Sequence, residues 1–167
     1  MPVASSPVPP GPTEESVWDY PRPPRVEECR QRLTVVFNGQ VVADTTRAKR
    51  VLETSQPPAY YFPPADVRVR EFLTPSGHVT SCEWKGLARY YVVTVGDRHS
   101  ENAAWCYPDP APGYEAIRDH VAFYPGRMDG CYIGGLRARA QDGDFYGGWI
   151  TDHVVGPFKG APGTEQW

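Results

Sequence analysis

The sequence predicts a mostly β protein, a single domain of short antiparallel strands with one or two short helices and extended arms. The 167 residues include 19 prolines and 16 glycines, and long helical patterns are scarce, which is typical of short strands joined by tight turns. Asn38-Gly39 separates two alternating β-branched runs, the strongest short-range hairpin signal. A second pair of strand-like runs flanks Lys85-Gly86.

The remaining elements follow in chain order after a first hairpin over residues 32–45. Apolar residues recur at helical spacing in TTRAKRVLETS, residues 45–55, and this spacing predicts one short helix that Pro57-Pro58 ends. The other predicted elements are extended segments at 59–62 and 66–73, strands at 78–84, 87–95, 101–107 and 121–124, one helical turn at 114–120, and a last hairpin at 133–140.

Composition divides the chain into three parts. Residues 1–31 form a proline-rich N-terminal arm, in which Trp18 and Tyr20 are expected to pin the chain across the domain, because two large aromatics are costly to leave in water. Residues 32–140 form the β domain. Residues 141–167 are glycine-rich yet too aromatic for a disordered tail, so they are expected to wrap the domain as a C-terminal arm.

Charge and sequence motifs exclude several classes of function. A net charge of −3 offers no basic footprint, so we expect no nucleic-acid partner and no membrane partner. The chain has no run of about 18 apolar residues and no signal-peptide pattern, which predicts a cytoplasmic protein. The four cysteines contain no C-x-x-C pair, so we expect free thiols and no metal. Phosphate-loop, dinucleotide, zinc-protease and nucleophile-elbow signatures are absent, and no cofactor is predicted.

The stretch SCEWKGLARYYVV, residues 81–93, raises the question of what Lys85 does. Lys85 is either a solvated lysine at a hairpin corner or a side chain that points into an aromatic-lined cavity. In the second case we expect desolvation to lower its pKa and make it a Schiff-base nucleophile or an anion clamp. Cys82 and Glu83 alternate along the strand and face opposite sides, which argues against a Cys-Glu-Lys catalytic cluster.

Aromatic residues supply the walls of a possible binding site. Trp105 and Tyr107 share one face of their strand, while Asn102 belongs to the other face. The interior is either a packed aromatic core or an aromatic-walled cavity, and small alanines beside the large rings leave room for a ligand. Arg127 is either an anion binder at the rim or the partner of Asp129 in a salt bridge.

Several motifs resemble one known family when taken in order: VVFNGQVVADT, VLETSQPPAYYFPPADV, CEWKGLARYY, NAAWCYPDP and VAFYPGRMDG. Over about residues 32–133 the chain resembles domain-of-unknown-function family 427 (DUF427). The resemblance implies a β-tent (Mss4-like) fold, like that of methionine sulfoxide reductase B and the thalidomide-binding domain of cereblon. It implies no zinc, since the C-x-x-C pairs of those relatives are missing here. The family is also catalogued as nucleotidyltransferase-like, but the sequence has no carboxylate pair or phosphate loop to support that activity.

The resemblance and the residues together predict a small-molecule-binding protein with an aromatic pocket on the sheet face, and leave open whether it is an enzyme. Lys85 is the expected polar anchor or proton-transfer group, and Tyr107 is the second catalytic candidate. The alternative is a non-catalytic interaction or homo-oligomerisation module, for example a homodimer, with an aromatic core. The expected ligand-binding residues are Tyr60, Tyr61, Trp84, Tyr90, Asn102, Trp105 and Arg127.

Overall fold

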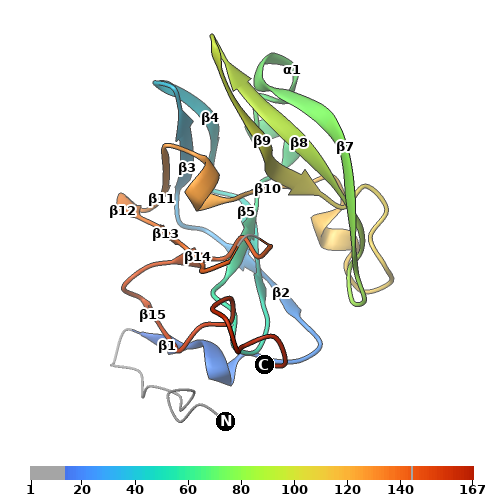
Figure 1. Cartoon of the computed structure of the whole chain (residues 1–167), viewed down its shortest axis with the longest axis vertical. Coiled ribbons are helices and arrows are strands. Elements are labelled where there is room, and N and C mark those ends of the chain that lie inside the picture. The colour runs from blue at the N-terminus through green and yellow to red at the C-terminus, as the bar shows by residue number, and fades with distance from the viewer. Residues whose placement is uncertain (1–13, 144) are drawn as a thin grey trace.

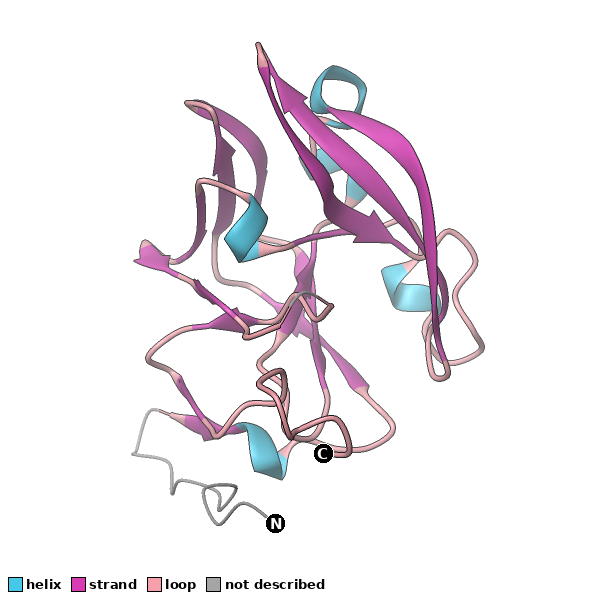
Figure 2. Ribbon diagram, in the orientation of Figure 1, coloured by secondary structure: helices cyan, strands magenta, loops and turns pink. Residues whose placement is uncertain are grey.

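The structure is a computed structural model that describes residues 14–143 and 145–167. Strands dominate these residues, and the helical parts are single short turns (Figure 2). This confirms the prediction of a mostly β chain with short antiparallel sheets and one short α-helix. The β-tent arrangement itself stays a prediction.

Two four-stranded antiparallel sheets occupy the upper part of the molecule in Figure 1. Their strand orders are β12-β11-β3-β4 and β10-β9-β8-β7. The strands of the first sheet are β3 (Leu33–Phe37), β4 (Gln40–Thr45), β11 (Gly130–Ile133) and β12 (Leu136–Arg137). Those of the second are β7 (Leu73–Cys82), β8 (Gly86–Val95), β9 (Arg98–Cys106) and β10 (Val121–Phe123).

A third antiparallel sheet, of order β2-β5-β6, lies below these two in Figure 1. Its strands are β2 (Arg25–Cys29), β5 (Ala48–Leu52) and β6 (Ala59–Tyr61). Two short pairs complete the described strands: β1 (Glu15–Ser16) with β15 (Val154–Val155), and β13 (Arg139–Ala140) with β14 (Trp149–Ile150). The helical turns are η2 (Val17–Asp19), η3 (Pro64–Asp66), α1 (Val69–Phe72), η4 (Glu115–Ile117) and η5 (Pro125–Arg127).

The predicted hairpins around Asn38-Gly39 and Lys85-Gly86 are confirmed. Asn38 and Gly39 have φ angles of 48° and 78°, so both turn residues adopt the left-handed backbone that a tight hairpin between β3 and β4 requires. The chain reverses again between β7 and β8, where residues 83–85 form the connection and Cys82 pairs with Gly86.

The helix predicted over residues 45–55 is wrong, because this segment contains strand β5. β5 is the central strand of its sheet, paired with β2 on one side and β6 on the other. Val51 and Leu52 are both buried, on opposite faces, so adjacent positions are apolar. A strand covered on both faces reproduces the apolar spacing of a helix over so short a stretch.

The extended segment predicted over residues 66–73 is also wrong for most of its length. Val67 makes a single bridge with Ala43, and residues 69–72 then form the helical turn α1. Phe72 donates its backbone N–H to the carbonyl of Arg68 at 3.1 Å, and Arg68 pairs with Glu71 one helical turn away. Local hydrogen bonding therefore outweighs the alternation of valines here.

The main hydrophobic core joins the two four-stranded sheets and the β6–β10 region. Its largest fully buried side chains include Phe62, Phe123 and Trp149. Alternation along β9 and β10 sends the intervening residues to the opposite face, where they form a second, mostly aromatic cluster with residues of β5, β6 and β8. The candidate site is built from this second cluster.

The terminal segments are held together at the foot of the molecule. Tyr20 is buried with Val17, Leu52 and Val154 in a third cluster, and Trp18 donates its indole N–H to the carbonyl of Pro157 at 2.8 Å. Residues 1–13 of the predicted N-terminal arm lie outside the described residues, and the limits of the three predicted parts stay predictions.

The four cysteines are free thiols, three of them buried. Within residues 14–143 and 145–167, no helix has the length and apolar character needed to cross a membrane. The cytoplasmic address stays a prediction.

Candidate functional site

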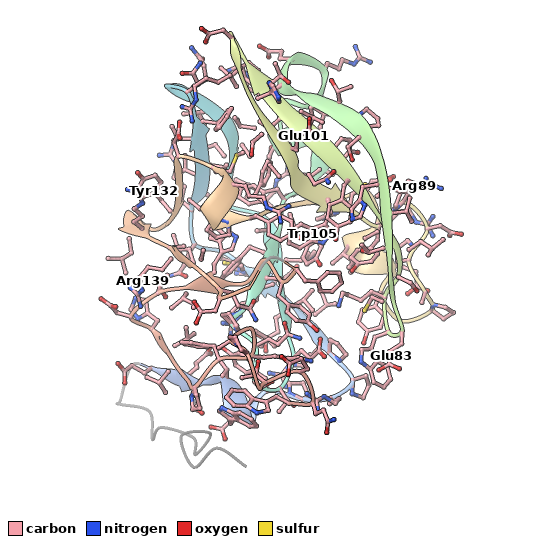
Figure 3. All side chains as sticks on the ribbon, in the orientation of Figure 1. Glu83, Arg89, Glu101, Trp105, Tyr132 and Arg139 are labelled. Atoms are coloured by element: carbon pink, nitrogen blue, oxygen red, sulfur yellow. The ribbon has the colours of Figure 1, made fainter. Side chains whose placement is uncertain are left out.

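A cavity of about 270 Å³ opens beside the second cluster, between the tip of the β7–β8 hairpin, strands β6 and β9, and residues 145–148. Figure 3 shows Trp105 near the centre of the molecule and Glu83 at the lower tip of that hairpin. Most of the wall is aromatic. The rings that line it are Tyr61, Trp84, Tyr90, Trp105, Tyr107, Tyr124, Phe145 and Tyr146.

The backbone of the hairpin tip places Lys85 in this cavity. Gly86 has a φ of 110°, which strongly favours glycine. A Cβ at Gly86 would also lie 3.3 Å from the backbone of Asp109 and of Ala111. This close approach allows Ala111 to donate its N–H to the carbonyl of Lys85 at 2.8 Å. The tip is thus tied to the loop after β9, and the side chain of Lys85 lines the cavity.

Lys85 is a buried cation. Lys85 is only 9% exposed, and its Nζ lies 5.9 Å from the ring centroid of Tyr107. Among the described residues, no carboxylate lies within 4.0 Å of this ammonium group. Burial by itself lowers the pKa of Lys85, but interactions with Tyr61, Cys82 and Glu53, including a hydrogen bond to Cys82, outweigh burial and raise it. The side chain is therefore an ammonium at neutral pH.

This finding corrects one expectation. A lowered pKa was expected if Lys85 entered an aromatic cavity, because desolvation disfavours the charged amine. The interactions of Lys85 with Tyr61, Cys82 and Glu53 reverse the direction. Of the two chemistries considered for a cavity lysine, the geometry and charge fit an anion clamp and not a neutral amine nucleophile.

Three of the phenols around the cavity are neutral at physiological pH. Burial raises the pKa of Tyr61, Tyr107 and Tyr124. The indole N–H of Trp105 donates to the hydroxyl of Tyr61 at 3.2 Å. The hydroxyl of Tyr124 donates to the carbonyl of Phe145 at 2.8 Å, which ties the C-terminal segment to strand β10. The single proton of Tyr124 is thus already used, and none of the three neutral phenols is a base.

The C-terminal segment forms the remaining wall. Gly147 lies flat against the second cluster: a Cβ there would come 2.7 Å from Cζ3 of Trp105. A Cβ at Gly148 would come 2.7 Å from the carbonyl oxygen of Pro57. The N–H of Gly148 donates to the amide oxygen of Gln141 at 3.1 Å. Two consecutive glycines thus let the chain pass between side chains that would exclude any larger residue. Lys159 adds a second ammonium group to the lining.

Six of the nine predicted site residues line one cavity, and three do not. Those that line it are Tyr61, Trp84, Lys85, Tyr90, Trp105 and Tyr107. Tyr60 projects to the other face of β6, where it packs against Trp149 with ring centroids 5.2 Å apart.

Asn102 and Arg127 contact each other and do not line the cavity. The guanidinium of Arg127 lies 4.2 Å from the ring centroid of Tyr124 and donates to the backbone carbonyl of Asn102 at 2.7 Å. Asn102 has a φ of 51°. The alternative prediction for Arg127 was a salt bridge with Asp129. In the structure, Asp129 forms a salt bridge with Arg98 at 2.8 Å.

Sequence reasoning missed the polar rim and the C-terminal wall. Glu53 and Gln56 follow β5, the strand that was expected to be a helix, so their position could not be anticipated. The signal for the C-terminal wall was present, since residues 145–149 combine two glycines with three aromatics. This pattern predicted that the C-terminal arm wraps the domain, but it did not predict which surface of the domain the arm covers.

Within residues 14–143 and 145–167, no three His, Cys, Asp or Glu side chains gather as a group that could hold a metal ion. Comparison with curated proteins gives no match. A protein-family profile, described as a domain of unknown function (DUF427), matches residues 25–134, which is more than half of the chain. The chain with this aromatic cavity and its buried lysine therefore belongs to the DUF427 family.

Proposed function

We propose that the protein binds a small organic molecule in the aromatic cavity and that Lys85 anchors the molecule by its charge. The observation that carries this proposal is the buried ammonium group of Lys85, which has no carboxylate within ion-pair distance among the described residues and faces open space lined by rings. Ligand sites combine apolar walls with a few placed polar groups in this way.

The energetics support a ligand at this position. Burial removes part of the hydration of the Lys85 ammonium group, and the ring of Tyr107, a hydrogen bond to Cys82 and the more distant charge of Glu53 compensate for it. A bound anion would add an ion pair in a low-dielectric site, where such a pair is stronger than in water. A packed aromatic core would have no such need for a cation.

The charge states favour binding over proton abstraction. At neutral pH Lys85 is already protonated, and burial keeps Tyr107 as a neutral phenol. Both groups are hydrogen-bond donors under these conditions, and neither is a general base. An activity in which either residue donates a proton is compatible with this arrangement, whereas one that needs either as a base is not.

A cavity-blocking variant tests the proposal. Ala59 lines the cavity, and Ala59→Trp would fill it, while Ala65→Trp in the exposed turn η3 adds the same bulk elsewhere. Molecules that raise the melting temperature are first found in a fragment library, since a ligand that binds only the native state stabilises it. Circular dichroism checks that both variants fold.

We expect the melting shifts to persist in Ala65→Trp and to disappear in Ala59→Trp. Equal shifts in both variants would place binding outside the cavity, and a library with no binder would contradict the proposal. The competing interaction module predicts a different behaviour, a melting temperature that rises with protein concentration.

A further inference from the structure

We propose that the ligand class is a small aromatic monocarboxylate, held with its carboxylate against Lys85 and its ring between the aromatic walls. This inference rests on the proposed function, because it names the ligand of the same cavity. It is carried by the size of the cavity, the balance of charges around it, and the place of the ammonium group among the rings.

The cavity size limits the ligand. Its volume of about 270 Å³ lies just below the range of drug-sized sites, roughly 300–1,000 Å³. The walls are flat: Tyr61 and Trp105 meet edge to face, with centroids 6.1 Å apart, and Tyr107 is tilted against Tyr61 at 6.2 Å. Such surfaces favour one further planar ring, which gains from offset or edge contacts.

The charge balance favours a single negative charge. The cavity is lined by two cations, Lys85 and Lys159, and by two anions, Glu53 and Glu83. Lys159 also faces the ring of Tyr146 and donates to the carbonyl of Trp167 at 3.4 Å. Lys85 faces the ring of Tyr107 and makes a hydrogen bond to Cys82, so its ammonium group keeps N–H donors for a ligand. A ligand with two or more negative charges, such as a phosphate ester or nucleotide, would meet the two carboxylates as well.

Aromatic walls alone would also suit an organic cation, since rings attract quaternary ammonium groups. The position of Lys85 decides against this. Its Nζ already lies over the ring of Tyr107 and is buried with it, so a second cation in the same space would be repelled at low dielectric. The neutral phenols of Tyr61 and Tyr107 are hydrogen-bonded to each other, and this pair leaves one O–H donor, which suits a carboxylate oxygen.

Isothermal titration calorimetry with four probes of one ring size tests this inference. The probes are phenylacetate, phenylacetamide, phenyl phosphate and benzyltrimethylammonium. We expect phenylacetate to bind at least about tenfold more tightly than the amide of the same shape. Lys85→Met, which keeps the length of the side chain without its charge, should abolish this preference, so that acid and amide bind with similar affinity.

Lys49→Met is the matched control, because Lys49 lies outside the cavity and pairs with Glu28 at the surface. It should retain the full preference for phenylacetate. If Lys85→Met fails to fold, the acid-to-amide ratio of the unaltered protein still decides the question.

Several outcomes would overturn the inference. Equal affinity for acid and amide would show that the charge of the ligand plays no part in recognition. Tighter binding of phenyl phosphate or of the ammonium probe would indicate another ligand class. If none of the four probes binds while a library fragment is blocked by Ala59→Trp, this inference fails and the proposed function stands. If no fragment binds at all, both fail.

Discussion

Gly147 shows at the scale of one residue how tightly the C-terminal wall is fitted. It has no side chain, and the six-membered ring of Trp105 and the ring of Tyr124 occupy the space that a Cβ would need. Trp105 is itself buried and held by its hydrogen bond to Tyr61, so it has little freedom to move aside. The wall of the cavity therefore depends on glycine at this position.

Gly147→Ala is expected to lower the free energy of unfolding by about 1–3 kcal/mol, the usual cost of overpacking a core. Urea denaturation measures the loss. Gly126→Ala is the matched control, since its Cβ would touch only Cβ of Ala140 at 3.2 Å, and it should cost less. A Gly147→Ala protein as stable as the control would show that residues 145–148 are not packed against Trp105.

The sequence could place Lys85 at a hairpin corner beside aromatic strands, but it could not give the charge of the side chain in the folded protein. The pKa that determines this charge depends in part on Glu53, more than thirty positions away in the chain, and on Tyr61 of β6. Local sequence predicts where a residue lies along a turn, whereas its electrostatic surroundings arise only when distant segments meet.

Strand β5 illustrates the same limit at the scale of an element. Its apolar spacing fits a helix as well as a doubly covered strand, and only its pairing with β2 and β6 decides between them. The Asn38-Gly39 hairpin, in contrast, was predictable because a two-residue turn specifies its own backbone. Elements determined by local turn chemistry are predictable from sequence, and elements determined by tertiary pairing are not.

Two leucine-to-alanine substitutions, one buried and one exposed, test the position of β5. Leu52 is 1% exposed and packs with Val17 and Val154, so it holds both terminal segments against the domain. Leu52→Ala is expected to lower the free energy of unfolding by about 2–5 kcal/mol. Leu87 on β8 is 53% exposed, and Leu87→Ala should change stability by no more than about 0.5 kcal/mol. Thermal or urea melts that gave equal losses would contradict the strand assignment of β5.

The whole molecule is expected to lose stability in alkali because many of its phenols are buried. Burial raises the pKa of Tyr60 to about 12 and raises those of Tyr61 and Tyr107 as well. The unfolded chain ionises its phenols near pH 10, whereas the folded chain keeps them neutral. Above pH 10 the unfolded state therefore binds fewer protons, and stability falls as pH rises.

Each such phenol contributes about 1.4 kcal/mol per pH unit over that window, and its contribution is fully present below pH 10. Urea melts at pH 8 and pH 11 measure the loss. Tyr60→Phe should show a smaller drop than the unaltered protein, because one buried titrating group is gone. Equal stability at the two pH values would mean that the phenols are accessible to solvent in the folded state.

The sequence predicted one part of the cavity lining and missed the other. Trp84 and Lys85, in the turn between β7 and β8, line one cavity with Trp105 of β9, as the order of motifs predicts. The C-terminal wall comes from a segment about forty residues beyond β9, and no local pattern says which surface such a segment covers. Tyr60 was misplaced relative to the cavity because adjacent residues of a strand face opposite sides, so only Tyr61 lines it.

The most direct measurement follows from the small number of lysines, which are Lys49, Lys85 and Lys159. In protein labelled with ¹⁵N-lysine, nuclear magnetic resonance can follow the side-chain nitrogen of each, and Lys85→Met assigns its signal. We predict that Lys85 has the signature of an ammonium group at neutral pH and that its signal shifts on addition of phenylacetate, while that of Lys49 does not move. A Lys85 signal of a neutral amine, or one that stays unchanged while phenylacetate binds, would contradict the account.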